Sequence, residues 1–69
     1  MDAYREAQRL YAETLSSGAA GPERLAVLEE ALHQIGALVP NALPDVRPAL
    51  LLMTSALAEQ IAGLQEETR

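Results

Sequence analysis

Apolar side chains recur at steps of three and four residues along three stretches of the chain, and clusters of glycine and proline separate these stretches. Such spacing is typical of one face of an α-helix, whereas a half-buried β-strand would show strict alternation. The sequence therefore predicts an all-α fold with helices over about residues 2–17, 22–39 and 46–66. Because 69 residues suffice for one domain at most, we expect a single helical domain over 1–69.

Residues at the expected helix ends support this division. Asp2 can accept a hydrogen bond from a free backbone N–H at the start of the first helix, where the helix dipole also favours a carboxylate. Gly18 and Gly21 provide a stop after that helix. Pro22 suits the first position of the second helix, because its missing N–H costs nothing there.

Prolines at positions 40, 44 and 48 cannot all lie inside one helix, since each removes a hydrogen-bond donor and clashes with the preceding turn. They predict a linker over 40–45 and place Pro48 in the first turn of the third helix, where proline is tolerated. Short loops favour antiparallel neighbours. We therefore expect an up-down-up three-helix bundle, or a helical hairpin with the N-terminal helix packed against it.

Each expected helix has an apolar stripe that would face the core. The predicted core residues are Tyr4, Ala7, Tyr11 and Leu15 in the first helix, Leu25, Leu28, Leu32, Ile35 and Val39 in the second, and Val46, Leu50, Met53, Leu57, Ile61 and Leu64 in the third. Several large apolar residues lie outside these stripes and would not face the core. Val27 and Leu38 lie about 100° from the centre of the second stripe, and Leu51 and Leu52 lie on opposite flanks of the third.

The small size of the chain makes this apolar surplus important. A single core in a chain below about 70–80 residues rarely supplies more than about 3–5 kcal/mol. The chain contains no Cys, Phe or Trp, so it has neither disulfides nor the side chains that bury the largest areas. Self-association is the remaining way to bury the surplus, which predicts a homo-oligomer, most simply a two-fold dimer.

The expected interface lies on the second and third helices. Ala49, Ala56 and Gly63 recur at steps of seven, and small side chains at that spacing let two backbones approach closely. The residues assigned to the interface are Val27, Leu38, Ala49, Leu51, Leu52 and Ala56. The alternative occupant of this surface is an amphipathic helix of a different protein.

Ten acidic and five basic residues give the chain a formal net charge of -5. This balance argues against nucleic acid as a partner, because contacts with phosphates need clustered Lys and Arg. No apolar run approaches the roughly 20 residues of a membrane span, so no membrane partner is expected. The first residues contain no apolar leader segment and the chain has no Cys, and both features favour a cytoplasmic location.

No residue pattern predicts catalysis or metal binding. Glu30 and His33 have the i, i+3 spacing of helical di-iron ligands, but both point away from the second stripe. Glu13 and Glu59 are the further carboxylates that such a site would need. We interpret these residues as solvated and expect neither a metal nor a cofactor. Thr54, beside the third stripe, is expected to bond back to a carbonyl one turn earlier rather than to act in catalysis.

The sequence therefore predicts a non-enzymatic interaction or oligomerisation module of the adaptor, scaffold or co-chaperone type. Two alternatives stay open. A small acidic regulator would dock on a basic partner and would bind more weakly as salt rises. A small helical enzyme would place its site between subunits, with Arg24 and Arg47 as the candidate contacts for a carboxylate substrate.

Overall fold

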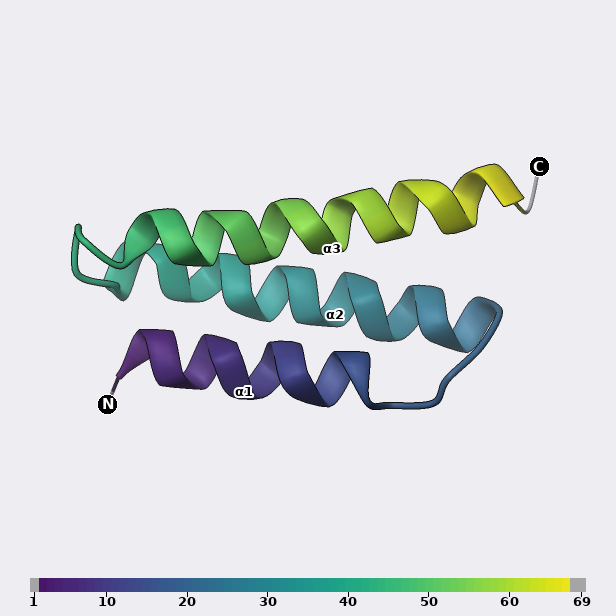
Figure 1. Ribbon diagram of the computed structural model, residues 1–69, viewed down its shortest axis with the longest axis horizontal. Coiled ribbons are helices and arrows are strands. Elements are labelled where there is room, and N and C mark those ends of the chain that lie inside the picture. The colour runs from purple at the N-terminus through teal and green to yellow at the C-terminus, as the bar shows by residue number, and fades with distance from the viewer. Residues whose placement is uncertain (1, 68–69) are drawn as a thin grey trace.

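Three helices account for most of the computed structural model, which describes residues 2–67 (Figure 1). They are α1 (Ala3–Leu15), α2 (Pro22–Leu38) and α3 (Arg47–Glu67), and a short 3₁₀ helix, η1 (Val39–Asn41), directly follows α2. No β-strand occurs between residues 2 and 67. The predicted all-α class is confirmed, and the helices lie where the spacing of apolar residues places them.

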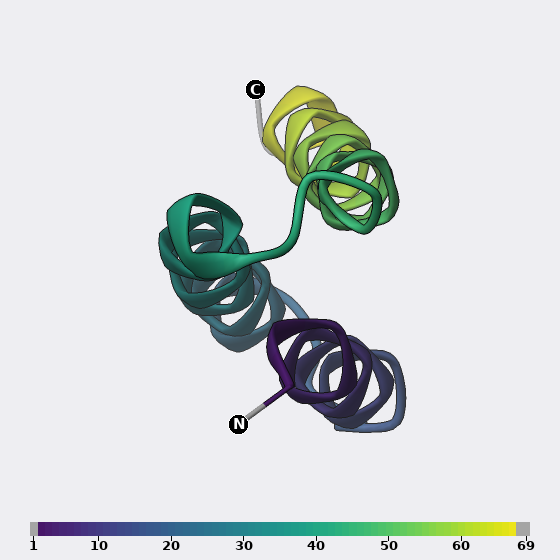
Figure 2. The same ribbon diagram turned by 90° about the vertical axis from the view of Figure 1, so that its left-hand side faces the viewer.

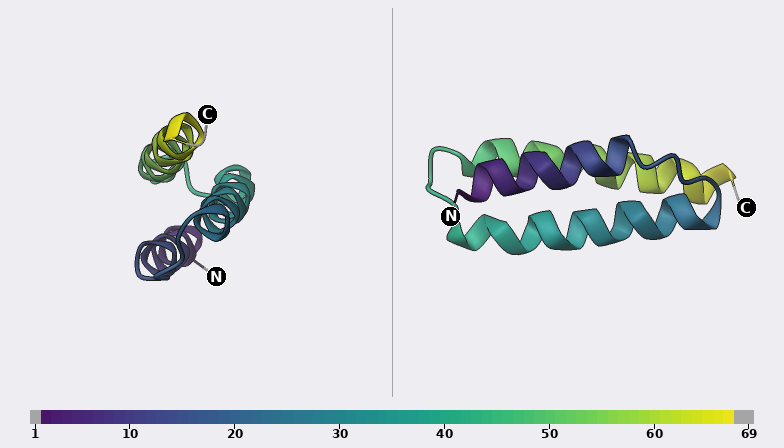
Figure 3. Two further views of the ribbon diagram at one scale, coloured as in Figure 1. Left: turned by 90° about the vertical axis from the view of Figure 1, so that its right-hand side faces the viewer. Right: turned by 90° about the horizontal axis from the view of Figure 1, so that it is seen from below.

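The middle helix, α2, packs against both of the other helices, and the chain direction alternates from one helix to the next (Figure 1). End-on views show α2 at the apex, with α1 and α3 diverging from it (Figures 2 and 3). α1 and α3 touch each other far less than either touches α2. The fold is thus an α2–α3 hairpin with α1 packed on α2, in up-down-up order.

The predicted start signals of the first two helices are confirmed. The backbone N–H of Tyr4 donates to Asp2 Oδ1 at 3.0 Å, so Asp2 caps α1. Pro22 is the first residue of α2. Between these helices, Gly18 and Gly21 have φ angles of 72° and 62°, a left-handed conformation that glycine adopts without steric penalty.

The connection from α2 to α3 is made of two tight turns. η1 contains Pro40, and the Ala42 N–H closes it by donating to Val39 O at 3.1 Å. The second turn brings the Arg47 N–H within 3.2 Å of Leu43 O, directly before α3. Pro48 is the second residue of α3, at a position whose N–H has no partner within the helix.

The core is small and lies where α2 meets its two neighbours. Its four largest fully buried side chains come from α2 and α3 alone: Leu28, Ile35, Leu50 and Leu57. The remaining buried apolar residues are alanines: Ala7, Ala31 and Ala42. The other residues of the predicted second and third stripes are partly buried around this centre, as the periodicity predicts.

The prediction for the first stripe is wrong at its C-terminal end. Leu15 is exposed, and Thr14 is buried in its place. Thr14 lies two turns after the buried Ala7 on the same line of the helix. Its hydroxyl donates to Leu10 O at 2.7 Å, and this bond satisfies the one polar group of the side chain. Burying a threonine therefore leaves no unpaired donor there.

Replacing Leu57 with Ala should lower the free energy of unfolding by about 2–5 kcal/mol, because the side chain is fully buried and its loss leaves a cavity. Urea denaturation followed by far-ultraviolet circular dichroism measures this change. Leu15→Ala is the matched control, for which we expect a loss of less than about 1 kcal/mol. Equal losses for the two variants at one protein concentration would contradict the core described here.

Candidate functional site

Within residues 2–67, four large apolar side chains stay exposed to solvent after the chain has folded. Their exposed fractions are 48% for Leu15, 69% for Leu43, 53% for Leu51 and 72% for Leu52. Leu43 lies in the turn before α3, and Leu51 and Leu52 lie in the second turn of that helix. Three of the four therefore gather at the end of the molecule where α2 leads into α3 (Figure 1).

The exposed side of α3 has an unusual composition. Between Arg47 and Glu59 the helix contains no charged residue. The α3 outer face, as we define it, consists of the exposed residues Pro48, Leu51, Leu52, Ser55, Ala58 and Ala62. At 100° per residue these side chains share one side of the helix, opposite the buried Leu50 and Leu57. The exposed Glu59 lies on the same side, between Leu52 and Ser55 in angle. The outer face is therefore apolar and weakly polar over its first three turns, up to the carboxylate of Glu59.

The exposed side of α1 is charged instead. Arg9 donates to Glu13 Oε1 at 2.7 Å and also pairs with Glu6. The hydrogen bond from Arg9 lowers the pKa of the Glu6 carboxyl, and the two carboxylates raise the pKa of Arg9. Such pairs at a solvated surface contribute little to stability. They make α1 an ordinary solvated helix and set it apart from α3.

The two leucines that the sequence assigns to an interface on α3 are exposed, but the two alanines are not. Ala49 and Ala56 are half-buried. Ala56 lies about 140° around the helix from Leu51, so one flat surface cannot include both. Gly63, in the same line of small residues, faces open space. An interface role for Ala49 and Ala56 stays a prediction, and the structure places them beside the outer face rather than on it.

The apolar surplus on α2 has an explanation within the chain. Val27 and Leu38 are half-buried, and Leu38 packs against the core. Both belong to the side of α2 that also carries the buried Ala31, which lines a groove shared with α1. The apolar arc of α2 is wide because that helix has two neighbours in the same molecule. The predicted interface role of Val27 and Leu38 stays a prediction.

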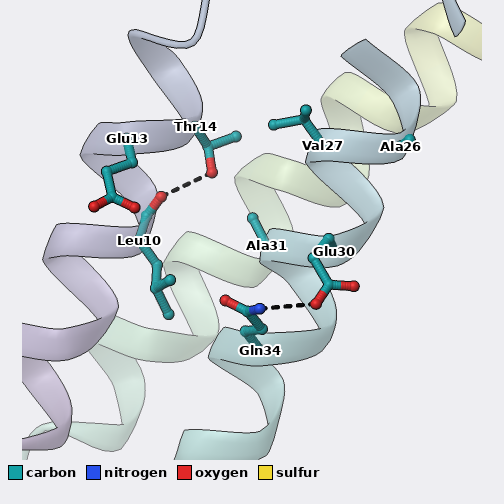
Figure 4. A pocket seen from close by; sticks show the side chains of 8 residues that line it. All are labelled: Leu10, Glu13, Thr14, Ala26, Val27, Glu30, Ala31 and Gln34. Atoms are coloured by element: carbon teal, nitrogen blue, oxygen red, sulfur yellow. Dashed lines mark hydrogen bonds between the residues drawn. The ribbon is translucent and has the colours of Figure 1, made fainter. Parts of the chain in front are cut away.

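The groove between α1 and α2 has a volume of about 340 Å³ (Figure 4). Leu10, Val27 and Ala31 line its inner part, and Glu13 and Glu30 lie at its edges. Neither carboxylate is turned toward the other, because Glu13 accepts from Arg9 and Glu30 accepts from Gln34 Nε2 at 2.7 Å. The groove is thus apolar, with carboxylates that already have partners on their own helices.

A second groove, of about 460 Å³, lies at the end of the molecule. It separates the N-terminus of α1 from the turns that lead into α3, and its lining residues are Asp2, Ala3, Tyr4, Asn41, Ala42, Leu43 and Val46. Leu43 is its most exposed apolar residue, and sequence periodicity missed it because it lies in a turn. The carboxylate of Asp2 is used as the cap of α1.

The two arginines considered for substrate binding both have structural partners. Arg24 Nη2 donates to Gln60 Oε1 at 3.1 Å and so joins α2 to α3. Arg47 Nε donates to Ala42 O at 3.1 Å, and its Nη2 lies 3.5 Å from Pro40 O. Neither arginine lines either of the two grooves. The structure therefore does not bring them together around a carboxylate-sized site.

The residues considered for metal binding are dispersed. Glu30 and His33 lie on the exposed side of α2, Glu13 lies on α1, and Glu59 lies on the exposed side of α3. Between residues 2 and 67, no group of three or more His, Cys, Asp or Glu side chains is placed to hold a metal ion. Thr54 Oγ1 donates to Leu51 O at 2.8 Å, which confirms its predicted bond to the preceding turn.

No protein-family model matches the chain, and searches of curated proteins and of solved structures find no match either. Within the described range, no helix is both long and apolar enough to cross a membrane. Any functional conclusion therefore rests on the chain's own surface, where Leu51 and Leu52 of the α3 outer face are among the exposed large apolar residues.

Arg47→Met should lower the free energy of unfolding by about 1 kcal/mol, since the carbonyls of the α2–α3 turn lose a charged donor. Chemical denaturation at fixed protein concentration measures the change. Arg5→Met, at an exposed position on α1, removes the same charge and should change stability by less than about 0.5 kcal/mol. Identical effects of the two substitutions would show that Arg47 does not hold the turn.

Proposed function

We propose that this chain is a small non-enzymatic interaction module that associates with a second copy of itself through the α3 outer face. One observation carries the proposal: Leu51 and Leu52 stay exposed after the chain has folded, in a stretch of α3 over residues 48–58 that contains no charged side chain. Exposed apolar patches on soluble proteins commonly mark contact sites with other proteins. The charged exposed side of α1 supplies the contrast within the same molecule.

The small core supports self-association. Among residues 2–67, only four large side chains are fully buried, and all four come from α2 and α3. Chains of this size need a disulfide, a metal, an unusually good helix packing or a partner to become stable. The sequence contains no Cys, which removes the first of these. Burying the α3 outer face of two copies would add four leucines to the apolar interior.

The dimensions of the chain also support self-association. Its accessible surface is 4676 Å². A compact monomer of this mass would expose about 4,200 Å². The radius of gyration is 12.3 Å, whereas about 11 Å is typical for a domain of this length. The chain is therefore more open than a closed domain, and the excess area is comparable with one helix face.

The energetic scale suggests a dimer of moderate affinity. Full burial of a leucine side chain contributes about 1.5–3 kcal/mol, and Leu51 and Leu52 are only partly covered in the single chain. Association also costs about 4–15 kcal/mol in lost freedom of motion. The gain from four leucines exceeds this cost only modestly at best, so the dimer should dissociate on dilution.

The two alternative functions receive less support. An acidic regulator would need a dense group of carboxylates, but the ten acidic residues are distributed along the chain from Asp2 to Glu67. An enzyme with an arginine clamp would need Arg24 or Arg47 at a ligand-sized groove, and neither lines the two described above. Neither alternative accounts for the exposed leucines of α3.

Leu52→Glu and Leu51→Glu should each convert the dimer to a monomer, because two charges would be placed inside an apolar contact. Size-exclusion chromatography with light scattering measures the mass, which for the unmodified chain should approach twice 7.4 kDa at high micromolar concentration. Circular dichroism should show that helicity is largely retained, since both positions face solvent in the single chain.

Leu15→Glu is the matched control, because it places the same charge at an exposed leucine on a different helix. This variant should keep the dimeric mass. A monomeric mass for the unmodified chain at every concentration would contradict the proposal. So would an unchanged dimeric mass in both the Leu51 and the Leu52 variants.

A further inference from the structure

We infer that the groove between α1 and α2 binds an amphipathic helix of a different protein, one whose apolar stripe has Lys or Arg on both flanks. The residues that line this groove come from α1 and α2 and not from α3. The inference therefore goes beyond the proposed self-association and does not depend on it. It rests on the apolar floor of the groove and on the charge of its two edges (Figure 4).

The floor of the groove is apolar and elongated. Leu10 of α1 and Val27 and Ala31 of α2 line its inner part, and its volume is about 340 Å³. On α2 the lining residues extend from Ala26 to Gln34, which corresponds to about 12 Å at 1.5 Å per residue. A groove of this kind between two helices suits a third helix that lays its apolar side chains into it.

The edge of the groove on α2 is negatively charged. Glu30 lines this edge, and Glu23 lies on the same side of the helix seven residues earlier. Glu30 accepts a hydrogen bond from Gln34 Nε2 at 2.7 Å, but the glutamine is neutral, so the charge of Glu30 is not compensated by this bond. Both glutamates are exposed, and basic side chains of a partner can reach them.

The edge of the groove on α1 is also acidic. Glu13 lines it and shares the single positive charge of Arg9 with Glu6, so the three side chains have a net charge of about -1. Arg9 itself does not line the groove. Its eight lining residues, all within the described part of the chain, include two carboxylates and no basic side chain. Both edges therefore favour a cation.

These charges determine the chemistry of the occupant. The residues that flank the apolar stripe of a bound helix lie at the edges of the groove, as residues at the e and g positions of a coiled coil do. Seven residues of a partner helix rise by about 10.5 Å, which is also the rise from Glu23 to Glu30. Basic residues at steps of seven can therefore meet both carboxylates while the apolar stripe contacts Val27.

The same argument excludes a second copy of this chain as the occupant. A copy would bring a formal net charge of -5 to a groove with two acidic edges, and like charges across a contact cost affinity. The groove and the α3 outer face thus select different partners. The apolar floor provides the contact area, and the carboxylates determine which helix binds.

Synthetic peptides of about 15 residues, long enough to form an amphipathic helix, test the inference by fluorescence anisotropy with the unmodified chain. The first has leucines at steps of three and four and lysines on both flanks, and it should bind. A second with glutamates in place of the lysines should not bind, and neither should a third with serines in place of the leucines. Raising the salt concentration should weaken binding of the first peptide several-fold, because the carboxylates are exposed to screening.

Two charge reversals on α2 locate the site. Glu30→Lys should weaken binding of the lysine peptide about tenfold, because it places a positive charge at the edge of the groove. Glu29→Lys is the matched control, since it makes the same change at an exposed position about 100° around the same helix. It should weaken binding less than about twofold. Circular dichroism of both variants should show unchanged helicity.

Three results would overturn the inference. They are no binding of the lysine peptide, equal binding of the lysine and glutamate peptides, and equal weakening by Glu30→Lys and Glu29→Lys. The last of these would show attraction to the net charge of the chain rather than to the groove. Light scattering of the unmodified chain without peptide tests the proposed self-association separately, so a monomeric mass would overturn that proposal and leave the peptide result intact.

Discussion

The structure depends on α2 having two neighbours. A helix with an apolar arc wider than one partner can cover must be buried on two sides, and α1 and α3 provide these two sides. Leu28 and Ile35 are fully buried as a result. The arrangement has a consequence for α3, which packs mainly on α2 and touches α1 far less. One side of α3 is therefore left in solvent, and that side carries Leu51 and Leu52.

The three helices thus present different surfaces. The exposed side of α1 is covered by the Glu6–Arg9–Glu13 network and needs no partner. Ala7 and Thr14 keep the buried side of α1 small, so α1 adds little large apolar volume to the core. The outer side of α3 combines leucines with small residues and lacks charges over the three turns that precede Glu59. Association through that side would give α3 the second neighbour that α2 already has.

Much of this architecture could be predicted from periodicity and helix-end residues. The caps and breakers set the helix positions well, because Asp2, Pro22 and the prolines of the linker act through local backbone chemistry. The six interface residues were harder to predict from the sequence. A wide apolar arc has the same pattern whether a second chain or a neighbouring helix of the same chain covers it. Leu38, which packs against the core of its own chain, shows the ambiguity.

For each surface residue that the periodicity did not predict, the structure gives a physical reason. Leu43 lies in a turn and belongs to no stripe. Leu15 is exposed because a threonine whose hydroxyl bonds to its own helix can be buried in its place. Ser55, Ala58 and Ala62 are small, so a search for large apolar residues passes over them. The absence of charge between Arg47 and Glu59 was the signal that could have identified the part of this face that contains Ser55 and Ala58.

Sedimentation equilibrium of the unmodified chain over a wide concentration range tests the central claim most directly. The account predicts a reversible shift from a monomer of 7.4 kDa at low concentration to a species of twice that mass, with no larger species. A single monomeric mass throughout, in a chain that is stably helical, would contradict the claim that α3 needs a second copy.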